Sequence, residues 1–250
     1  MCRVSSHHMD FDGKTALVTG ASRNIGQAIA TELAELGADV GVSAKSNREG
    51  CLETAARIED AGGEAAVALA DLTEPSEIET MVAEIREELG PIDVLVNNAT
   101  YRPEKPFLEV ELEELDEVQN INFRGLFLTT QAALPLLRRS PRARIVNIGG
   151  LSGHKGARGR AHVVTLKAAV AGFTRALASE FDQPGMTVNT VVPGSIETLR
   201  TGPDPGHLRD TGGRRFGRPE EVAFIVAKLC EDGAGYVNGQ TIHVNGGSHL

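Results

Sequence analysis

Short hydrophobic runs alternate with longer segments of helical spacing along most of the chain. The run Thr15–Thr19 is followed by Ile25–Leu36, in which apolar residues recur every three or four positions. The same reasoning predicts further strands at Asp39–Ser43, Ala65–Leu69, Ile92–Val96, Arg144–Ile148, Thr187–Val192 and Thr241–Val244. It predicts further helices at Glu49–Ala61, Ser76–Leu89, Leu112–Arg139, Val163–Phe181 and Pro219–Cys230. Strands that alternate with helices in this way predict βαβ units.

Successive βαβ units predict an α/β fold of the Rossmann type, a doubly wound parallel sheet of about seven strands. The length of 250 residues suits one domain. We expect that domain to span residues 13–250, after a polar and flexible segment at 1–12. Residues 199–218 contain repeated Gly and Pro and are expected to form an irregular lid or substrate loop. Ligands of such sheets bind beyond the carboxyl ends of the strands.

Composition and charge exclude several classes of protein. Hydrophobic residues make up 41% of the chain, enough for a substantial core, and the net charge of −9 argues against a nucleic-acid binder. No apolar run is long enough to span a membrane, and residues 1–10 lack the apolar stretch of a secretory signal. Cys2, Cys51 and Cys230 are far apart, so no zinc or redox motif is visible. We therefore expect a cytoplasmic protein with free thiols and no metal site.

The segment from Thr19 to Gly26, with the sequence T-G-A-S-R-N-I-G, joins the first predicted strand to the first helix. A glycine turn at the start of a helix lets backbone N–H groups and the helix dipole approach a pyrophosphate. A glycine-rich turn alone is a weak signal, but its position between strand and helix strengthens it. The segment is therefore a candidate dinucleotide-binding loop.

The same segment resembles the T-G-x-x-x-G-x-G motif of the short-chain dehydrogenase/reductase family. Asn24 stands in place of the middle glycine, and Asn is the other residue that best tolerates a positive φ. Further similar motifs follow in the family's order: Asn97-Asn98-Ala99 with Thr100 in place of a glycine, Asn122, Pro193-Gly194 with Thr198, Gly239-Gln240 and Gly246-Gly247. The resemblance covers essentially the whole chain and implies a nicotinamide cofactor.

The resemblance also implies which residues contact that cofactor. They are Gly20, Ser22, Arg23, Asn24, Ile25, Gly26, Asp71, Leu72, Asn98, Ala99, Lys167, Pro193, Gly194, Ile196 and Thr198.

The end of the second strand favours NADP(H) over NAD(H). NAD-specific members of this fold place an acidic residue there to accept a hydrogen bond from the ribose 2′-hydroxyl. The chain instead has Lys45, Ser46 and Arg48, and Arg23 lies in the preceding loop. Cations at this position suit a 2′-phosphate. The alternative is that Lys45 and Arg48 are solvated surface charges.

The family's usual proton-transfer pair is missing from the positions where the resemblance places it. The family uses a Ser, a Tyr and a Lys four residues after the Tyr, with a helical Asn in a proton relay. Lys167 and Asn122 are present, but the Tyr position falls on Val163 and the Ser position on Gly150. The interval from 150 to 163 agrees with the family's usual spacing, so a shifted alignment is not indicated. Neither Val163 nor Gly150 carries an exchangeable side-chain proton.

Four nearby residues are candidates for a substitute acid or base. Tyr101 follows the Asn97–Thr100 loop, Ser152 and His154 follow Gly150, and His162 precedes Val163. Packing or capping roles are the alternative for each of them. Lys167 is expected to contact the cofactor ribose whether or not a Tyr is present, and a second role as a titrating group remains open.

These observations leave three functions open. The first is an NADP(H)-dependent oxidoreductase of a carbonyl or alcohol with an altered acid/base group. The second is an NADP(H)-binding protein without dehydrogenase activity, such as a sensor or assembly partner, and the third is a non-redox enzyme. The substrate is expected to be a small molecule. Five charged or titratable side chains of the lid favour an anionic substrate, and the alternative is that they are solvated surface groups: Arg200, His207, Arg209, Arg214 and Arg215. The resemblance implies a homo-oligomer, a tetramer or dimer joined through Leu112–Arg139 and Val163–Phe181.

Overall fold

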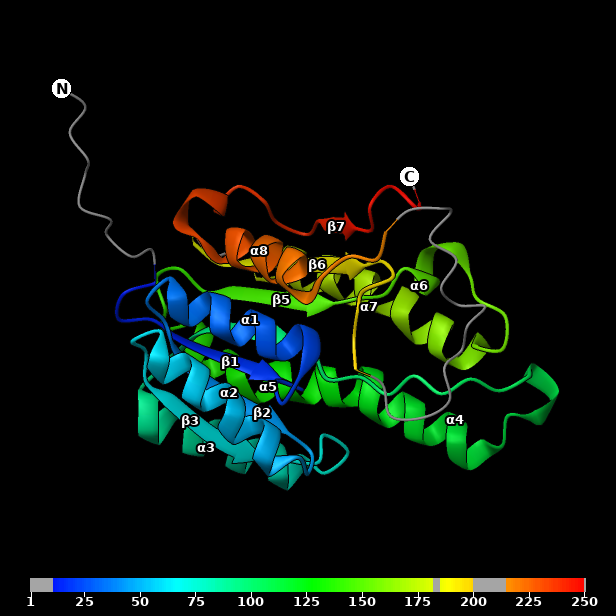
Figure 1. Cartoon of the computed structure of the whole chain (residues 1–250), viewed down its shortest axis with the longest axis horizontal. Coiled ribbons are helices and arrows are strands. Elements are labelled where there is room, and N and C mark those ends of the chain that lie inside the picture. Colours follow the sequence, from blue (N-terminus) through cyan, green and yellow to red (C-terminus); the bar gives the residue numbers. More distant parts are fainter. Residues whose placement is uncertain (1–10, 182–184, 200–214, 250) are drawn as a thin grey trace.

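A computed structural model describes residues 11–181, 185–199 and 215–249, and these residues form one parallel sheet covered by helices on both faces (Figure 1). The seven strands lie in the order β3-β2-β1-β4-β5-β6-β7, and every neighbouring pair is parallel. Their bounds are β1 Thr15–Thr19, β2 Asp39–Ala44, β3 Ala65–Leu69, β4 Ile92–Asn97, β5 Arg144–Ile148, β6 Thr187–Pro193 and β7 Thr241–Val244. The predicted fold class, a single Rossmann-type α/β domain, is confirmed.

Three helices cover each face of the sheet. Helices α1 (Asn24–Glu35), α2 (Arg48–Asp60) and α8 (Pro219–Cys230) pack over one core, and α3 (Pro75–Leu89), α5 (Leu126–Leu137) and α7 (Ala161–Glu180) over the other. Alternate residues of one strand serve the two cores: Val18 faces the first and Leu17 the second. The strands are therefore apolar on both faces, as burial between two helical layers requires.

The predicted helix Leu112–Arg139 is interrupted. It divides into α4 (Leu112–Gln119), a π-helical turn η2 (Asn120–Gly125) and α5. A π-helical turn inserts one extra residue per turn and shifts the side chains that follow it, and such turns are common at functional sites. Because the periodicity is apolar on both sides of the turn, the sequence pattern did not reveal it. Asn122 lies inside this turn.

The structure adds short elements and alters the expected start of the domain. Helix α6 (Ser152–Lys155) and the 3-10 turns η1 (Phe107–Glu109) and η4 (Asp232–Ala234) were not predicted. Phe11, which was assigned to the flexible start, is fully buried in the first core. Residues 1–10 and most of the expected lid, 200–214, lie outside the described residues.

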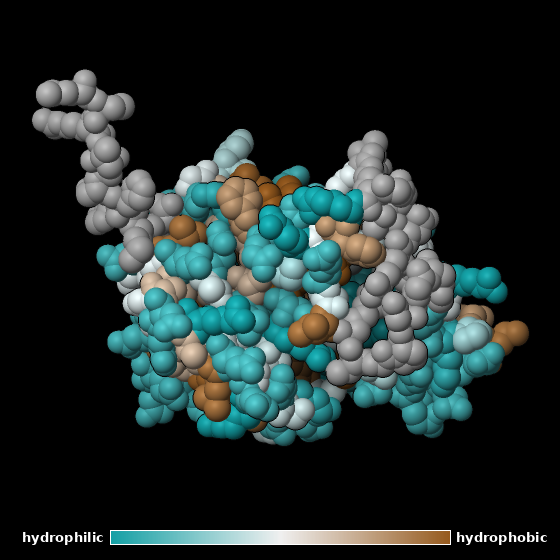
Figure 2. Space-filling view, in the orientation of Figure 1, coloured by the Kyte–Doolittle hydropathy of each residue, from teal (hydrophilic) through white to brown (hydrophobic). Residues whose placement is uncertain are grey.

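The exposed surface is consistent with the charge composition. Figure 2 shows a mostly hydrophilic face over α1, α2 and α8, with hydrophobic residues scattered across it. Within the described ranges, no helix is both long enough and apolar enough to cross a membrane.

Candidate cofactor and active site

The loop between β1 and α1 brings the amino end of a helix to the carboxyl edge of the sheet. Gly20 and Asn24 have φ angles of +63° and +54°, and Asn24 is the one non-glycine residue with a positive φ in the described ranges. The expectation that Asn24 supports this turn in place of a glycine is confirmed. The first turn of α1 contains no acidic side chain, so its partial positive charge remains available to an anionic ligand.

The loop is held in shape by the end of β4. Asn98 Nδ2 donates to the backbone oxygens of Thr19 and Gly20, both at 2.9 Å. The backbone N–H groups of Asn98 and Ala99 donate to Thr19 Oγ1 at 3.1 and 3.2 Å. A Cβ added at Gly26 would lie 2.2 Å from the Gly20 oxygen. These contacts leave no room for a side chain at position 26. The conformation of the β1–α1 loop is therefore fixed by the protein itself, and we call this loop the glycine cradle.

The carboxyl ends of β2 and β3 carry an ion pair. Lys45 Nζ lies 2.7 Å from Asp71 Oδ2, and Asp71 Oδ1 accepts from the backbone and hydroxyl of Thr73. Burial by itself would raise the pKa of Asp71, but the bonds from Lys45 and Thr73 outweigh it and hold that pKa below its usual value. The hydrogen bond to Asp71 raises the pKa of Lys45, so Lys45 is a firmly charged cation.

The other predicted residues of this region surround the same edge. Arg23, Ser46 and Arg48 are exposed, Ser22 and Leu72 are buried, and Ile25 packs against the first core. The side chain of Asn47 accepts from Gly50 N and caps α2. Across Ala44 to Arg48, therefore, the strand end offers cations and hydroxyls and no carboxylate of its own.

Lys167 lies across the carboxyl end of β5. Its Nζ donates to the backbone oxygen of Ile148 at 3.1 Å, and only 5% of the residue is exposed. A Cβ added at Gly150 would lie 3.3 Å from Lys167 Cγ and 3.4 Å from Cδ. Val163, one helical turn earlier on α7, is fully buried. The Lys167 stem therefore rests against the backbone of Gly150, where a larger residue would crowd it.

Burial changes the chemistry of this amine. Desolvation, with a smaller contribution from the charge of Arg102, lowers the pKa of Lys167 to about 7. An amine with this pKa exchanges a proton near neutral pH, as a general acid or base requires.

Asn122 holds the loop that follows β4. Its Oδ1 accepts from Thr100 Oγ1 at 2.9 Å and from Tyr101 N at 2.8 Å, and its Nδ2 donates to Tyr101 O at 2.7 Å. The side-chain amide of Asn122 is thus largely used in hydrogen bonds to the Thr100 hydroxyl and the Tyr101 backbone. Tyr101 is 39% exposed. The geometry assigns Asn122 a positioning role toward Tyr101.

The two histidines face different neighbours. His162 is buried on α7, and its Nε2 lies 3.5 Å from Glu114 Oε1 on α4. His154 on α6 packs against His243 of β7 and His249, with ring centroids 4.6 and 6.4 Å away. Desolvation, followed by the neighbouring imidazoles, lowers the pKa of His154. The structure therefore does not bring the two predicted histidines to one point.

The glycine after Ser152 lies against the turn of α7 that carries Lys167. Ser152 begins α6, which packs on α7, and a Cβ added at Gly153 would lie 2.8 Å from the Lys167 carbonyl carbon. The short helix α6 is thus pressed against the turn of α7 that carries Lys167. Of the four candidate substitutes for the missing acid or base, Ser152 is the nearest to Gly150 in the sequence, two residues after it.

The segment after β6 runs back toward α1. Gly194 N donates to Val244 O, and Ile196 forms an isolated parallel bridge with Gly217. At its end the side chain of Asn24 forms two hydrogen bonds with the backbone of Leu199: Nδ2 donates to Leu199 O at 2.9 Å, and Oδ1 accepts from Leu199 N at 2.8 Å. The sequence provided no signal for this pairing, because the two residues are 175 positions apart.

Two hollows border the described surface. One, of about 240 Å³, lies beside the segment after β6 and is lined by Ser195, Ile196, Arg215, Gly217, Glu221, Val244, Asn245, Gly246 and Ser248. Arg215 is paired there with both carboxylate oxygens of Glu221, at 2.7 and 2.5 Å. This pairing neutralises the one lid cation among Arg200, His207, Arg209, Arg214 and Arg215 that lies in the described ranges.

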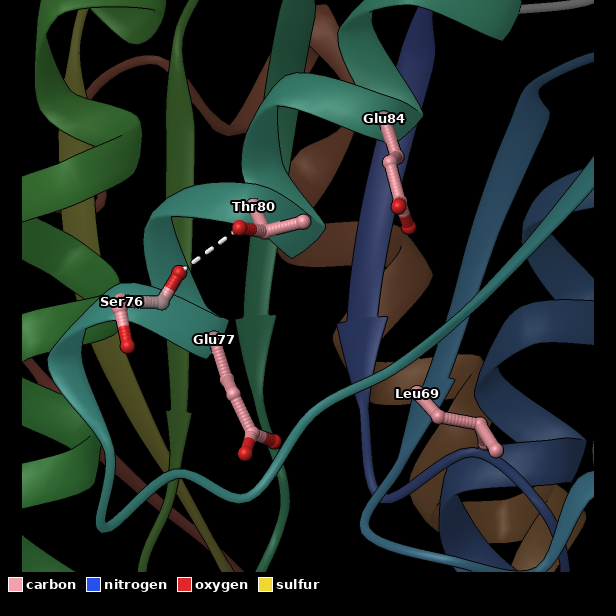
Figure 3. Close-up of a pocket in the computed structure, with 5 residues that line it drawn as sticks. All are labelled: Leu69, Ser76, Glu77, Thr80 and Glu84. Carbon is pink, nitrogen blue, oxygen red and sulfur yellow. Dashed lines mark hydrogen bonds between the residues drawn. The ribbon is translucent and has the colours of Figure 1, made fainter.

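The second hollow, also about 240 Å³, lies between β3 and α3 (Figure 3). It is lined by Leu69, Ser76, Glu77, Thr80 and Glu84, and Figure 3 shows both glutamate side chains pointing into the same region. Two carboxylates repel phosphate, so this hollow does not suit the phosphates of a dinucleotide.

Comparison with known proteins agrees with this geometry. Residues 20–249 match the family model described as Enoyl-(Acyl carrier protein) reductase. The chain is 37% identical to the 3-oxoacyl-[acyl-carrier-protein] reductase of Vibrio cholerae over 247 residues, which are 97% of this chain and all of that protein. It is equally identical to the Escherichia coli enzyme of the same name over 248 residues, with the same coverage. This chain belongs to the short-chain dehydrogenase/reductase family.

Solved structures of short-chain dehydrogenase/reductases superpose over nearly the whole chain. A short chain dehydrogenase from Burkholderia cenocepacia, solved in complex with NADP, has a TM-score of 0.91 at 32% identity and covers 96% of this chain and all of its own. A dehydrogenase/reductase from Sinorhizobium meliloti has a TM-score of 0.90 at 34% identity, covering 97% of both chains. The family places the chain among oxidoreductases that bind a nicotinamide cofactor.

The residues of this short-chain dehydrogenase/reductase fit such a cofactor on structural grounds. The glycine cradle at Gly20 and Gly26 would be filled by any added Cβ, and the acid-free start of α1 suits a pyrophosphate. Sequence reasoning missed Thr19, whose hydroxyl accepts from two backbone N–H groups of the β4 loop. It also missed Leu199. The first lies within the recognised motif, whereas the second has no local signature.

Proposed function

We propose that this protein is an NADP(H)-dependent oxidoreductase of a carbonyl or alcohol whose proton is handled by an altered acid/base group. The observation that carries the proposal is the buried Lys167, which lies against Gly150 and one turn from Val163. The dinucleotide loop at the same edge of the sheet is intact. A site that had lost its function would not need to keep an amine buried in this way, because burying an ammonium group with a single hydrogen bond, here to Ile148 O, costs free energy.

Residues at the β2 end support NADP(H) over NAD(H). The carboxyl end of β2, from Ala44 to Arg48, has no carboxylate for a ribose 2′-hydroxyl. The Lys45 side chain is 60% exposed at that edge, and Arg23, Ser46 and Arg48 are exposed as well. Lys45 is paired with Asp71 in the protein alone. A 2′-phosphate, with greater negative charge than one carboxylate, would compete for that ammonium group. The related Burkholderia structure that contains NADP supports the same choice.

The altered acid/base group follows from the family resemblance. That resemblance assigns the proton-transfer Ser and Tyr to positions 150 and 163, which are Gly and Val here. When bound, NADPH supplies a hydride for a carbonyl carbon. The ammonium form of Lys167 then gives a proton to the carbonyl oxygen and becomes a neutral amine, so that the product is an alcohol. In the reverse direction the neutral amine takes that proton from the alcohol.

Lys167 is favoured over the other candidates on geometry. His162 faces Glu114 and His154 faces two further histidines, while Asn122 holds the Tyr101 backbone. Ser152 begins α6, which packs on α7, and Tyr101 is exposed in the loop after β4. We therefore assign proton transfer to Lys167 and keep Ser152 and Tyr101 as candidates for orienting the substrate.

The proposal is tested with a panel of carbonyl compounds that is chosen partly from the reactions for which the relatives are named. It contains 3-oxoacyl thioesters, because two relatives are named for that reaction, together with simple ketones and aldehydes, charged and uncharged. NADPH-loaded protein is mixed with each compound in a stopped-flow instrument, and nicotinamide absorbance is followed. We expect absorbance loss with at least one compound, and we expect that loss to be about 10²- to 10⁴-fold slower in Lys167→Met. Tight NADPH binding with no absorbance loss for any compound would overturn the oxidoreductase proposal.

A second candidate is an NADP(H)-binding protein without dehydrogenase activity. The absence of a hydroxyl at positions 150 and 163 favours it. The double variant Gly150→Ser with Val163→Tyr distinguishes the two, with circular dichroism and thermal melting as folding controls because Val163 is fully buried. Reduction by the double variant alone would favour the binding protein; turnover by the natural chain favours the enzyme. Turnover of a substrate without change in the cofactor would indicate the non-redox alternative.

The cellular setting and assembly are also proposals. Cys51 and Cys230 are buried free thiols, and burial raises the pKa of both, which suits a reducing cytoplasm. Three apolar residues on η1 and α4, namely Phe107, Leu108 and Leu112, are between 65% and 94% exposed. An apolar group of this kind supports a homo-oligomer, a dimer or tetramer, formed through these helices.

A further inference from the structure

The link between Asn24 and Leu199 joins two parts of the chain that the sheet order separates. Asn24 begins α1 beside β1, whereas Leu199 ends the segment that follows β6. Strands β4 and β5 lie between β1 and β6 in the sheet. The segment from Gly194 to Leu199 therefore passes the carboxyl ends of β5 and β4 to reach the start of α1. In Figure 1 this segment is the yellow trace after β6.

The two hydrogen bonds of this link are complementary. Asn24 donates through Nδ2 to Leu199 O at 2.9 Å and accepts through Oδ1 from Leu199 N at 2.8 Å, so its amide pairs with both backbone polar groups of one residue, as a neighbouring strand would. The pairing satisfies both halves of the side-chain amide. It also uses the backbone of Leu199, whose side chain is 78% exposed and is not needed for it.

The conformation of Asn24 suits this role. With φ at +54°, it occupies the left-handed region where glycine and asparagine are best tolerated. A glycine at position 24 would keep the turn but would have no amide. The residue that departs from the family's middle glycine is thus the one that provides the link.

We propose that the Asn24 side chain and the Leu199 backbone form a clasp that slows release of the bound dinucleotide. This inference rests on the proposed NADP(H) site. The family resemblance implies a pyrophosphate at the start of α1 and a nicotinamide beside Gly194 and Thr198. A dinucleotide held in this way would contact both parts of the chain that the clasp joins. Release of the whole dinucleotide then requires the two hydrogen bonds to open.

The clasp is a positioning device, so its test measures release rates. NADPH bound to the full chain is chased with excess NADP⁺ in a stopped-flow instrument, and nicotinamide fluorescence is followed. Asn24→Gly keeps the turn and removes both bonds. We expect dissociation about 5- to 20-fold faster, since each exposed hydrogen bond contributes modestly. Leu199→Ala is the matched control and is expected to release NADPH at the natural rate, because its backbone bonds remain.

A second variant and a second ligand separate the clasp from simple damage to the loop. Leu199→Pro removes the N–H donor on the other side, and we expect it to speed release as well, without a full additive effect in the double variant with Asn24→Gly. Adenosine 2′,5′-bisphosphate lacks the nicotinamide half, and its release is expected to be unchanged in Asn24→Gly. Thermal melting checks that each variant is folded.

Failure of the proposed NADP(H) site and failure of the clasp give different results. No NADPH binding by the natural chain would overturn the proposed function itself. Binding with an unchanged release rate in Asn24→Gly would overturn the clasp alone. Equal acceleration for NADPH and adenosine 2′,5′-bisphosphate would also overturn it, because Asn24 would then act on the phosphate loop and not through Leu199.

Discussion

The loop after β1 and the loop after β5 lie at the same edge of the sheet but are built in opposite ways. In the first, Thr19, Gly20, Gly26 and Asn98 are so closely packed that an added methyl group at position 26 would meet backbone oxygen at 2.2 Å. In the second, the nearest atom to a Cβ added at Gly150 is Lys167 Cγ, at 3.3 Å, so the contact is looser and is made with a flexible side chain.

This difference indicates which part of the site tolerates change. A phosphate loop works through backbone N–H groups, so its geometry must be held by close packing. Proton transfer needs a titratable group at the right place, and more than one side chain can provide it. The proton-transfer group can therefore be replaced with less structural disruption than the phosphate loop.

The largest effect is expected at Lys167. Lys167→Met removes the proton donor, and the single-turnover rate of carbonyl reduction is expected to fall about 10²- to 10⁴-fold. With a pKa of about 7, the acid form of Lys167 predominates below neutrality. The natural rate should therefore decrease as the pH rises through 7, while the residual rate of the variant stays flat. Lys155→Met, an exposed lysine on α6, is the control, and equal rates in all three proteins would contradict the assignment.

Lys167→Met should also change how the free energy of unfolding depends on pH. The unfolded chain keeps the Lys167 proton up to a pH near its ordinary pKa of 10.5, whereas the folded chain loses it near 7. Between these values the unfolded state binds more protons, so the free energy of unfolding rises with pH. In urea titrations of the protein without cofactor, Lys167→Met should be more stabilising at pH 6 than at pH 9. A difference independent of pH would argue against a buried amine that titrates there.

An intermediate effect is expected from Gly26→Ala. Overpacking against the Gly20 oxygen and Asn98 should weaken NADPH binding about 10- to 100-fold or lower the melting temperature. Gly172→Ala is the matched control, because a Cβ at that position of α7 meets nothing within 4 Å and alanine favours a helix by about 1 kcal/mol. Calorimetric binding and thermal melting measure both. Natural affinity and stability in Gly26→Ala would show that the loop is not a tightly packed cradle.

The smallest effect is expected at the β2 end. Lys45→Gln removes a 60% exposed cation, and NADPH affinity should decrease about threefold to tenfold, with NADH affinity unchanged. Arg57→Gln removes one positive charge from an exposed position of α2 and should change neither affinity. Fluorescence titration at low and moderate salt measures both cofactors. Equal weakening for NADH would show that Lys45 acts through Asp71 and not on a 2′-phosphate.

Much of the fold followed from local patterns. Strands such as Thr15–Thr19 and Arg144–Ile148 match their predicted bounds, because short apolar runs between turns are buried on both faces of a parallel sheet. The π-helical turn at Asn120–Gly125 was missed, because its flanks share the apolar spacing of an ordinary helix. Phe11 was missed because a single apolar residue after a polar start has no periodicity to reveal its burial.

The sequence by itself determined the fold class, the position of the glycine loop, the lack of a carboxylate at the β2 end and the residue types at 150, 163 and 167. These are properties of residue type and of spacing within one or two elements. Only the tertiary structure decided that Asn24 pairs with the backbone of a residue 175 positions away, that His162 faces Glu114 and that burial lowers the pKa of Lys167 to about 7. Contacts between distant segments depend on the path of the whole chain, and desolvation depends on everything packed around a group.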